Sequence, residues 1–257
     1  MNPWPCQNTK TMQKTVNHIL GATVALAMTA TGAFAQIVPQ PIDSLPAVIT
    51  QPGSYYLTPQ AVAKTLTDPG YAIEIAGSGI SLDLRDLTVN SYSGIYIHNG
   101  HASDSGITVT STPNGAAVIN SVVPGGAPTG LYINGMISNV TVKGVTFTGL
   151  AQNNNWVGCN SRDNGSNDTI QFCTFQGYFA VGGDHETFMK NSVTLYGVGN
   201  SFYSGLPVFQ SDGQANSFKQ NTVASGNVQL LGTDTHQQNT LAVGTQINGG
   251  RQLGQTP

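Results

Sequence analysis

The sequence predicts an all-β fold, a single-stranded right-handed parallel β-helix of about eight turns. Three observations favour this fold. Short runs of alternating apolar and polar residues recur along the chain, each bounded by Gly or Asn. One eleven-residue pattern occurs twice at an offset of 28 residues. Only 8% of the residues are charged, and uncharged polar side chains stack on a repetitive sheet without like-charge repulsion.

The alternating runs predict strands of three to five residues. In each run, alternate side chains point to opposite faces, so the aliphatic residues face a core and their neighbours face outward. No 3.6-residue apolar stripe develops after residue 36, because Gly, Asn or Pro interrupts nearly every window. The clearest runs are Ile80-Ser81-Leu82-Asp83-Leu84, Ile95-Tyr96-Ile97, Ile107-Thr108-Val109, Leu131-Tyr132-Ile133 and Val140-Thr141-Val142.

The repeat has the form N-x-T-(V/I)-x-x-x-T-F-x-G and covers 139–149 and 167–177, with a looser copy at 200–205. A period of this size indicates stacked supersecondary units. About 220 residues at this period make about eight turns. The corners between strands need residues that tolerate positive φ, which suits the abundant Gly and Asn. A sandwich of short antiparallel strands is the alternative.

The first 35 residues predict a cleaved signal peptide. Lys10 and Lys14 precede an apolar run at 19–28, and the segment ends in Ala33-Phe34-Ala35, so cleavage is expected before Gln36. The apolar run is too short for the alternative, a membrane anchor. We therefore expect an exported protein, periplasmic or extracellular, without stable membrane insertion after cleavage. The expected β-helix domain covers 36–250, and 251–257 is a C-terminal tail.

The charge of the chain limits the classes of binding partner, and its cysteines limit the possible covalent and metal chemistry. Beyond residue 35 the chain has seven basic and twelve acidic residues, a formal charge of −5. This balance argues against nucleic acid and anionic membranes, which need clustered Lys and Arg. Cys159 and Cys173 are disulfide candidates in an oxidising compartment, and two unpaired thiols are the alternative. No further ligands lie at a spacing that would make them a metal site.

Residues 42–90 resemble the opening of bacterial right-handed parallel β-helix repeat proteins of the pectin-lyase-like superfamily. The segments concerned are Ile49-Thr50-Gln51-Pro52-Gly53-Ser54-Tyr55-Tyr56-Leu57 and Gly79-Ile80-Ser81-Leu82-Asp83-Leu84. The Asn-(Ser/Thr)-apolar tripeptides at 200–241 resemble NosD-like and carbohydrate-binding β-helix repeats. This resemblance implies a fold and not an activity. Neither the polygalacturonase set (D-D, G-H-G, R-I-K) nor the pectate lyase motifs (W-x-D-H, R-x-P-x-x-R) occur in the chain.

One acidic cluster is the candidate catalytic set. Asp184, His185 and Glu186 follow two glycines, and Asp184 and Glu186 share a side if this segment is extended. Two carboxylates and an imidazole could act as general acid and base in glycoside cleavage, or the carboxylates could bind Ca²⁺. A solvated corner is the alternative. No other cofactor is expected.

Aromatic side chains form the candidate binding set. Tyr96 and Tyr132 occupy equivalent places in Gly-Ile-Tyr-Ile and Gly-Leu-Tyr-Ile, so both are predicted to point outward. Asn154 and Trp156 would add polar and aromatic contacts from a loop. These residues favour a noncatalytic protein that binds polysaccharide or another surface glycan. The alternatives are a polysaccharide lyase or glycoside hydrolase, and a structural or adhesion module that assembles through the ends of the solenoid.

Overall fold

The computed structural model describes residues 38–98, 105–121, 129–134, 137–149, 159–162, 165–177, 179–181, 183–194, 209–211, 213–224, 228–244 and 246–253. The compact unit that holds the strands begins at Val38. The expected signal peptide lies outside the described residues and stays a prediction. Within the described residues, no helix is long and apolar enough to cross a membrane.

The described ranges contain twenty-six short strands in three parallel sheets, here named A, B and C. Sheet A contains β1 (Gln40–Ile42), β3 (Gly53–Leu57), β5 (Ile80–Asp83), β8 (Thr108–Thr110), β11 (Thr141–Lys143), β14 (Thr169–Gln171), β17 (Thr187–Met189), β20 (Ser217–Lys219), β23 (Thr235–Gln237) and β26 (Arg251–Gln252). Sheet B contains β2 (Ala47–Ile49), β4 (Tyr71–Ile75), β7 (Ser93–His98), β10 (Leu131–Asn134), β13 (Cys159–Arg162), β16 (Phe179–Val181), β19 (Phe209–Ser211), β22 (Val228–Gln229) and β25 (Ile247–Asn248). Sheet C contains β6 (Thr88–Ser91), β9 (Ala117–Ser121), β12 (Val145–Gly149), β15 (Thr174–Gln176), β18 (Ser192–Thr194), β21 (Thr222–Val223) and β24 (Thr240–Leu241).

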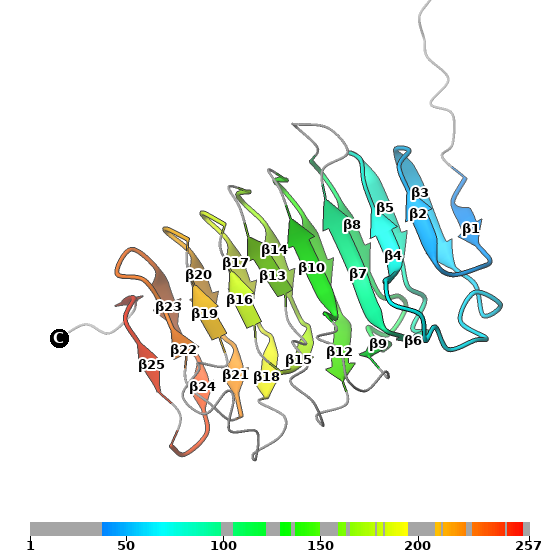
Figure 1. Cartoon of the computed structure of the whole chain (residues 1–257). Helices are drawn as coiled ribbons and strands as arrows, with labels where there is room; N and C mark the ends of the chain where they lie inside the picture. Colours follow the sequence, from blue (N-terminus) through cyan, green and yellow to red (C-terminus); the bar gives the residue numbers. More distant parts are fainter. Residues whose placement is uncertain are drawn as a thin grey trace, which may run out of the picture. The chain divides into compact units, whose positions relative to one another are not determined.

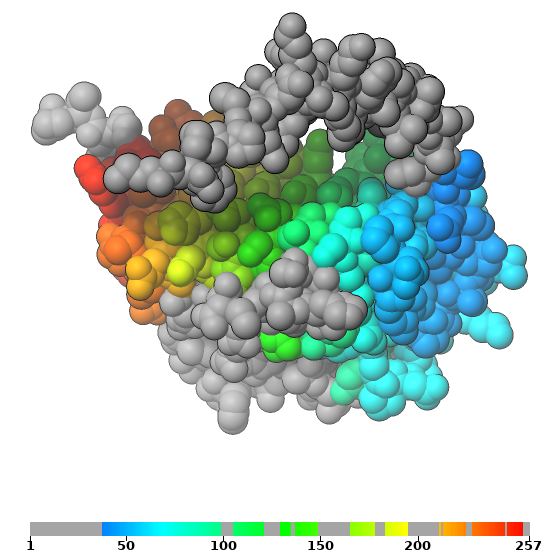
Figure 2. All heavy atoms as spheres, turned by 90° about the horizontal axis from the view of Figure 1, so that it is seen from above, coloured from blue at the N-terminus to red at the C-terminus, as the bar shows by residue number. Residues whose placement is uncertain are grey.

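The chain is a parallel β-helix, as the sequence predicts. From β5 onward each full turn runs from sheet A to sheet C, then to sheet B and back to sheet A, and each strand pairs in parallel with its equivalent one turn later. Figure 1 shows the turns stacked in sequence order from β1 to β25, and the space-filling view in Figure 2 shows the same blue-to-red order. Sheet A has ten strands, and the chain therefore makes nine turns between the first and the last of them, one more than the eight expected. The last pass, β26, extends the coil into the expected C-terminal tail.

The internal repeat corresponds to one turn of the coil. Thr141 pairs with Thr169, and Phe147 pairs with Phe175, which confirms the offset of 28 residues. The next turn is shorter, because Phe175 pairs with Val193, only 18 residues farther along. The next strand of sheet C is therefore β18, and the looser copy at 200–205 lies outside the described residues. Turn length varies because the number of residues between the strands of sheets C and B differs from turn to turn, while the parallel pairing of the strands is kept.

Inward side chains form stacked columns that make one core. Sheet C contributes a column in which the rings of Phe147 and Phe175 stack at 5.2 Å. Sheet A contributes Val142, Ile170 and Phe188, all buried. Each strand supplies only a few inward residues, so the core is built almost entirely from contacts between turns.

Two corners of the coil need left-handed backbone. Between sheets B and A, Asn139, Asn167 and His185 have φ values of 61°, 63° and 59°. Between sheets A and C, the equivalent residues in five successive turns are Gly144, Phe172, Lys190, Gln220 and Gln238, with φ from 71° down to 52°. The expectation that corners take positive φ is confirmed, although several corners use residues other than Gly and Asn.

The C-terminal end of the core becomes partly polar. In sheet A, buried Phe218 pairs with His236, and His236 pairs with exposed Gln252. In sheet C, buried Val223 pairs with Leu241, which is 36% exposed. The last turns therefore replace apolar core residues in sheet A with polar ones, which suits a solvated end of a solenoid.

Candidate functional site

The candidate catalytic residues lie at the corner between sheets B and A. His185 takes the left-handed conformation that Asn139 and Asn167 take in other turns. Asp184 and His185 are exposed, whereas only 1% of Glu186 is accessible. The Asp184 carboxylate already accepts a 2.7 Å hydrogen bond from the backbone N–H of Gln214.

Glu186 belongs to a buried polar ladder that runs through five turns. At this position each side chain accepts a hydrogen bond from the backbone N–H of the equivalent residue one turn earlier. The Val140 N–H donates to Asp168 at 2.8 Å, that of Asp168 to Glu186, that of Glu186 to Asn216 at 2.7 Å, and that of Asn216 to Asp234 at 2.9 Å. The acids at these positions therefore satisfy backbone donors inside the stack.

Burial changes the ionisation of the two acids in the middle of this ladder. It raises the pKa of Asp168 to about 7. Burial, and then the nearby Asp168 charge, raise the pKa of Glu186 to about 9. One oxygen of each carboxyl has no hydrogen-bond partner. Glu186 is therefore neutral at pH 7, because ionising it would place an uncompensated charge in the core.

The structure does not bring the candidate acid–base set together on one solvent-facing surface. Asp184 and His185 face outward from the corner, and Glu186 faces inward beneath it. A general acid must reach the glycosidic oxygen of its substrate, and a carboxyl buried to this extent does not. Among the described residues, no group of three or more His, Cys, Asp or Glu side chains could hold a metal ion.

The candidate tyrosines form a stacked aromatic ladder on the outer face of sheet B. Tyr96 pairs with Tyr132 in register, and their ring centroids are 5.3 Å apart with planes inclined by 10°. Tyr71 extends the stack from the preceding turn, with its ring 4.7 Å from that of Tyr96. All three are half-buried. The predicted equivalence and outward orientation of Tyr96 and Tyr132 are confirmed, and Tyr71 is an addition that the sequence analysis missed.

Polar side chains surround the tyrosine ladder. His98 Nε2 lies 2.6 Å from Glu74 Oε1, and the His98 ring stacks on Tyr96 at 4.4 Å. The Asn134 amide donates to the Tyr96 hydroxyl at 3.2 Å. Burial, followed by the neighbouring tyrosines, raises the pKa of Tyr71 to about 12, so its phenol stays neutral. The Glu74–His98 contact joins residues from successive turns. The sequence analysis did not predict it, although aligning Ile73-Glu74-Ile75 with Ile95-Tyr96-Ile97 would have placed Glu74 beside the strand that ends in His98.

The ladder presents ring edges more than ring faces. Tyr96 has Tyr71, Tyr132 and His98 stacked against it. A ligand along this face would therefore meet hydroxyl groups, ring edges and the polar pairs. The other two candidate binding residues, Asn154 and Trp156, lie outside the described residues.

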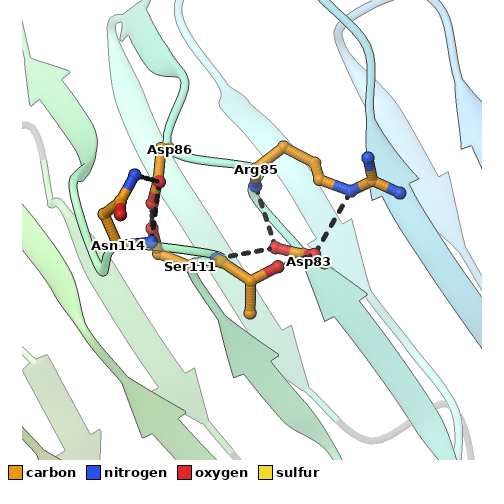
Figure 3. A network of polar contacts seen from close by, with 6 residues as sticks. Asp83, Arg85, Asp86, Ser111 and Asn114 are labelled. Carbon is orange, nitrogen blue, oxygen red and sulfur yellow. Dashed lines mark hydrogen bonds and ion pairs between the residues drawn. The ribbon is translucent and has the colours of Figure 1, made fainter.

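A second polar cluster, around Asp83 and Asp86, is structural. Asp83 accepts hydrogen bonds from the backbone N–H of Arg85 and, one turn later, from Thr112, and it pairs with the Arg85 guanidinium at 3.3 Å (Figure 3). Asp86 binds Asn114, Ser111 and the Ala116 N–H. The Ser111 hydroxyl, followed by the backbone N–H of Ala116, lowers the pKa of Asp86 to about 2. Both carboxylates thus hold the connection between β8 and β9.

The disulfide considered for Cys159 and Cys173 is not formed. Cys173 is a free, buried thiol whose Sγ lies 3.4 Å from the carbonyl oxygen of Gln171 and 3.7 Å from that of Val142. It lies at the corner between sheets A and C, whereas Cys159 begins β13 in sheet B. Burial raises the pKa of Cys173 to about 12, which makes it a poor nucleophile.

Comparisons with known proteins identify no relative: no family model, curated protein or solved structure matches the chain.

Proposed function

We propose that this protein binds a polysaccharide without cleaving it, through the outer face of sheet B. The observation that carries the proposal is the stack of Tyr71, Tyr96 and Tyr132 across three consecutive turns. A polymer lying along the coil would meet Tyr96 and Tyr132 in register on adjacent strands, about 4.8 Å apart, and the Tyr71 ring stacked on Tyr96 from the turn before. Tyrosine suits such a ligand, because it offers an apolar ring and a hydroxyl that can donate or accept.

The polar neighbours support recognition of sugar hydroxyl groups. Glu74 is an acceptor on the outer surface, with 37% of its side chain exposed, and His98 is held against it. Asn134 adds an amide beside the Tyr96 hydroxyl. These pairs hold the side chains in place before a ligand arrives, which reduces the entropy lost on binding.

Binding without cleavage is favoured by the location of Glu186. Glu186, one of the two carboxylic acids in the candidate acid–base set, is buried in the polar ladder and does not reach a substrate on the surface. An export signal, as expected from the sequence, would bring the protein to a compartment where surface glycans occur.

A panel of soluble neutral polysaccharides in affinity electrophoresis tests the proposal. We expect at least one polysaccharide to retard the wild-type protein. Its affinity for the Tyr96→Ala and Tyr132→Ala variants should be at least about tenfold lower, since an aromatic anchor of a binding face typically contributes that much or more. Tyr56→Ala is the matched control, because Tyr56 is also half-buried but lies on sheet A under Arg85.

Each mixture is also assayed for new reducing ends and unsaturated products. Products that disappear in the Asp184→Ala variant would establish an enzyme and overturn the proposal. Equal retardation of the wild-type and Tyr96→Ala proteins would also overturn it, because the ligand would then lie elsewhere.

A further inference from the structure

The corner between sheets A and C carries an exposed phenylalanine between lysines. Phe172 follows β14 and is 47% exposed. Its ring lies between two ammonium groups, with Lys143 Nζ at 5.7 Å and Lys190 Nζ at 5.2 Å from its centroid. Lys143 comes from the turn before Phe172 and Lys190 from the turn after it. Both distances fall within the range of a cation–π interaction.

A third lysine extends this row along the coil. Lys219 is in line with Lys143 on the outer face of sheet A, three strands away, through the pairings with Gln171 and Met189. Three strand spacings place the two backbones about 14 Å apart. The Lys190 backbone N–H donates to the Lys219 carbonyl at 3.0 Å, so the lysines lie on adjacent turns. We name Lys143, Phe172, Lys190 and Lys219 the basic corner.

No carboxylate in the described part of the chain forms an ion pair with these lysines; the pairs there are Arg85–Asp83 and His98–Glu74. Among the described acids of the turns that carry Phe172 and Lys190, Asp168 and Glu186 are buried at the corner between sheets B and A, and exposed Asp184 lies at that same corner, where it binds the Gln214 N–H. Three of the seven basic residues beyond residue 35 are therefore concentrated on one corner of an otherwise acidic chain. Among the described residues no carboxylate pairs with these lysines to offset their mutual repulsion, which favours an anionic ligand.

The conformation of Phe172 is costly for the fold. Its φ is 56°, in the left-handed region, where a bulky side chain is strained relative to glycine. The equivalent residue one turn earlier is Gly144, with φ 71°, so the corner accepts a residue without a side chain. About half of Phe172 lies in solvent, so burial does not offset this cost. Later turns have Lys190, Gln220 and Gln238 in the same conformation, so what distinguishes Phe172 is an exposed aromatic ring between two ammonium groups.

We propose that the basic corner binds an anionic polysaccharide, one whose sugar rings carry carboxylate or sulfate groups. The lysines pair with acidic groups along the polymer, and the exposed part of the Phe172 ring contacts the apolar surface of a sugar between them. This site is separate from the tyrosine ladder. The proposal adds a second class of ligand to the polysaccharide binding proposed for sheet B. Because the two sites consist of different residues, each is tested by its own variants.

Binding is measured by affinity electrophoresis and calorimetry with polygalacturonate as the carboxylated probe, dextran sulfate as the sulfated probe and dextran as the neutral probe. We expect polygalacturonate or dextran sulfate to bind, with an affinity that falls as salt rises, because two or three lysine contacts release counterions. The Lys143→Gln/Lys190→Gln variant should bind at least about tenfold more weakly, since the charged contacts supply most of such affinity. Lys64→Gln, which removes an exposed lysine elsewhere, should bind like the wild type.

The Phe172→Gly variant separates binding from folding. It should bind several-fold more weakly while its urea midpoint stays equal to that of the wild type or rises, since glycine relieves the left-handed strain. A lower midpoint would show that the ring stabilises the corner, and would overturn its assignment as a ligand contact.

Three other outcomes would overturn the proposal: equal binding to dextran and polygalacturonate, full affinity in the double lysine variant, or tighter binding to vesicles containing phosphatidylglycerol than to either anionic polysaccharide. Tyr96→Ala should leave binding at the basic corner unchanged. Loss of neutral polysaccharide binding alone would therefore affect the function proposed for sheet B and not this site.

Discussion

Replacing Glu186 with glutamine should change how the stability of this protein depends on pH. In the folded protein this carboxyl is almost inaccessible and accepts the N–H of Asp168. The next turn already has an amide, Asn216, at the same place in the ladder, where it makes the equivalent bond. The Glu186→Gln variant therefore keeps an acceptor oxygen in place and removes the ionisable proton.

The sign follows from the two raised pKa values. In the unfolded chain the pKa of these carboxyls is about 4, whereas in the folded protein burial raises the pKa of Asp168 to about 7 and that of Glu186 to about 9. Below about pH 4 both states hold the protons, and the contribution to stability is fully present. As pH rises, the unfolded chain releases protons that the folded chain retains, so stability falls until pH passes the folded pKa values. Each retained proton contributes a slope of up to about 1.4 kcal/mol per pH unit.

Urea unfolding followed by circular dichroism from pH 5 to pH 9 measures this slope. Between pH 6 and pH 8, the free energy of unfolding should fall less steeply with pH in the Glu186→Gln variant than in the wild type, by up to about 1.4 kcal/mol per pH unit. The variant should therefore be the more stable protein at pH 8. Asp43→Asn is the control, because Asp43 is exposed on the turn after β1. Identical pH profiles for wild type and Glu186→Gln would refute the reasoning, since Glu186 would then ionise in the fold as it does in the unfolded chain.

Three further predictions concern the stacked turns. Asn221→Ala should lower the free energy of unfolding by about 2–4 kcal/mol, because two backbone groups of the preceding turn lose their buried partner, and a loss below about 0.5 kcal/mol in urea titration would contradict this. Gly94→Ala should cost about 3 kcal/mol or more, since a Cβ there would collide with the Gly130 carbonyl; Gly106→Ala, where the Cβ meets nothing within 4 Å, should cost only about 1–2 kcal/mol in thermal melts. In a Cys6→Ser/Cys159→Ser variant, Cys173 should react with a thiol reagent at pH 8 only after unfolding, and rapid labelling of the native protein would show that this thiol is accessible.

Local patterns in the sequence were enough to predict much of the fold. Alternation determines which residues of a strand face the core, since successive side chains of a strand point to opposite faces. It therefore placed Tyr96 and Tyr132 on the outside correctly. The repeated Asn-x-Thr pattern predicted one pairing between turns, that of Thr141 with Thr169. These inferences depend on geometry within a few residues, which is why they needed no knowledge of the neighbouring turn.

The acidic cluster shows where local reasoning was insufficient. Asp184 and Glu186 were expected to share a side of an extended segment, but His185 turns the chain there with φ 59°. Glu186 consequently points into the core, where the N–H of Asp168 from the preceding turn needs an acceptor.

The sequence by itself determined that the chain is a parallel coil, which side chains point inward along each strand, and that its corners need left-handed residues. Tertiary structure decided which turns lie next to each other, because the connections from sheet C to sheet B differ in length without disturbing the pairing of strands. That register brings Glu74 to His98, and it places Phe172 between Lys143 and Lys190. In a solenoid every such contact joins residues from different turns, so the chemistry of its surface depends on how the turns stack.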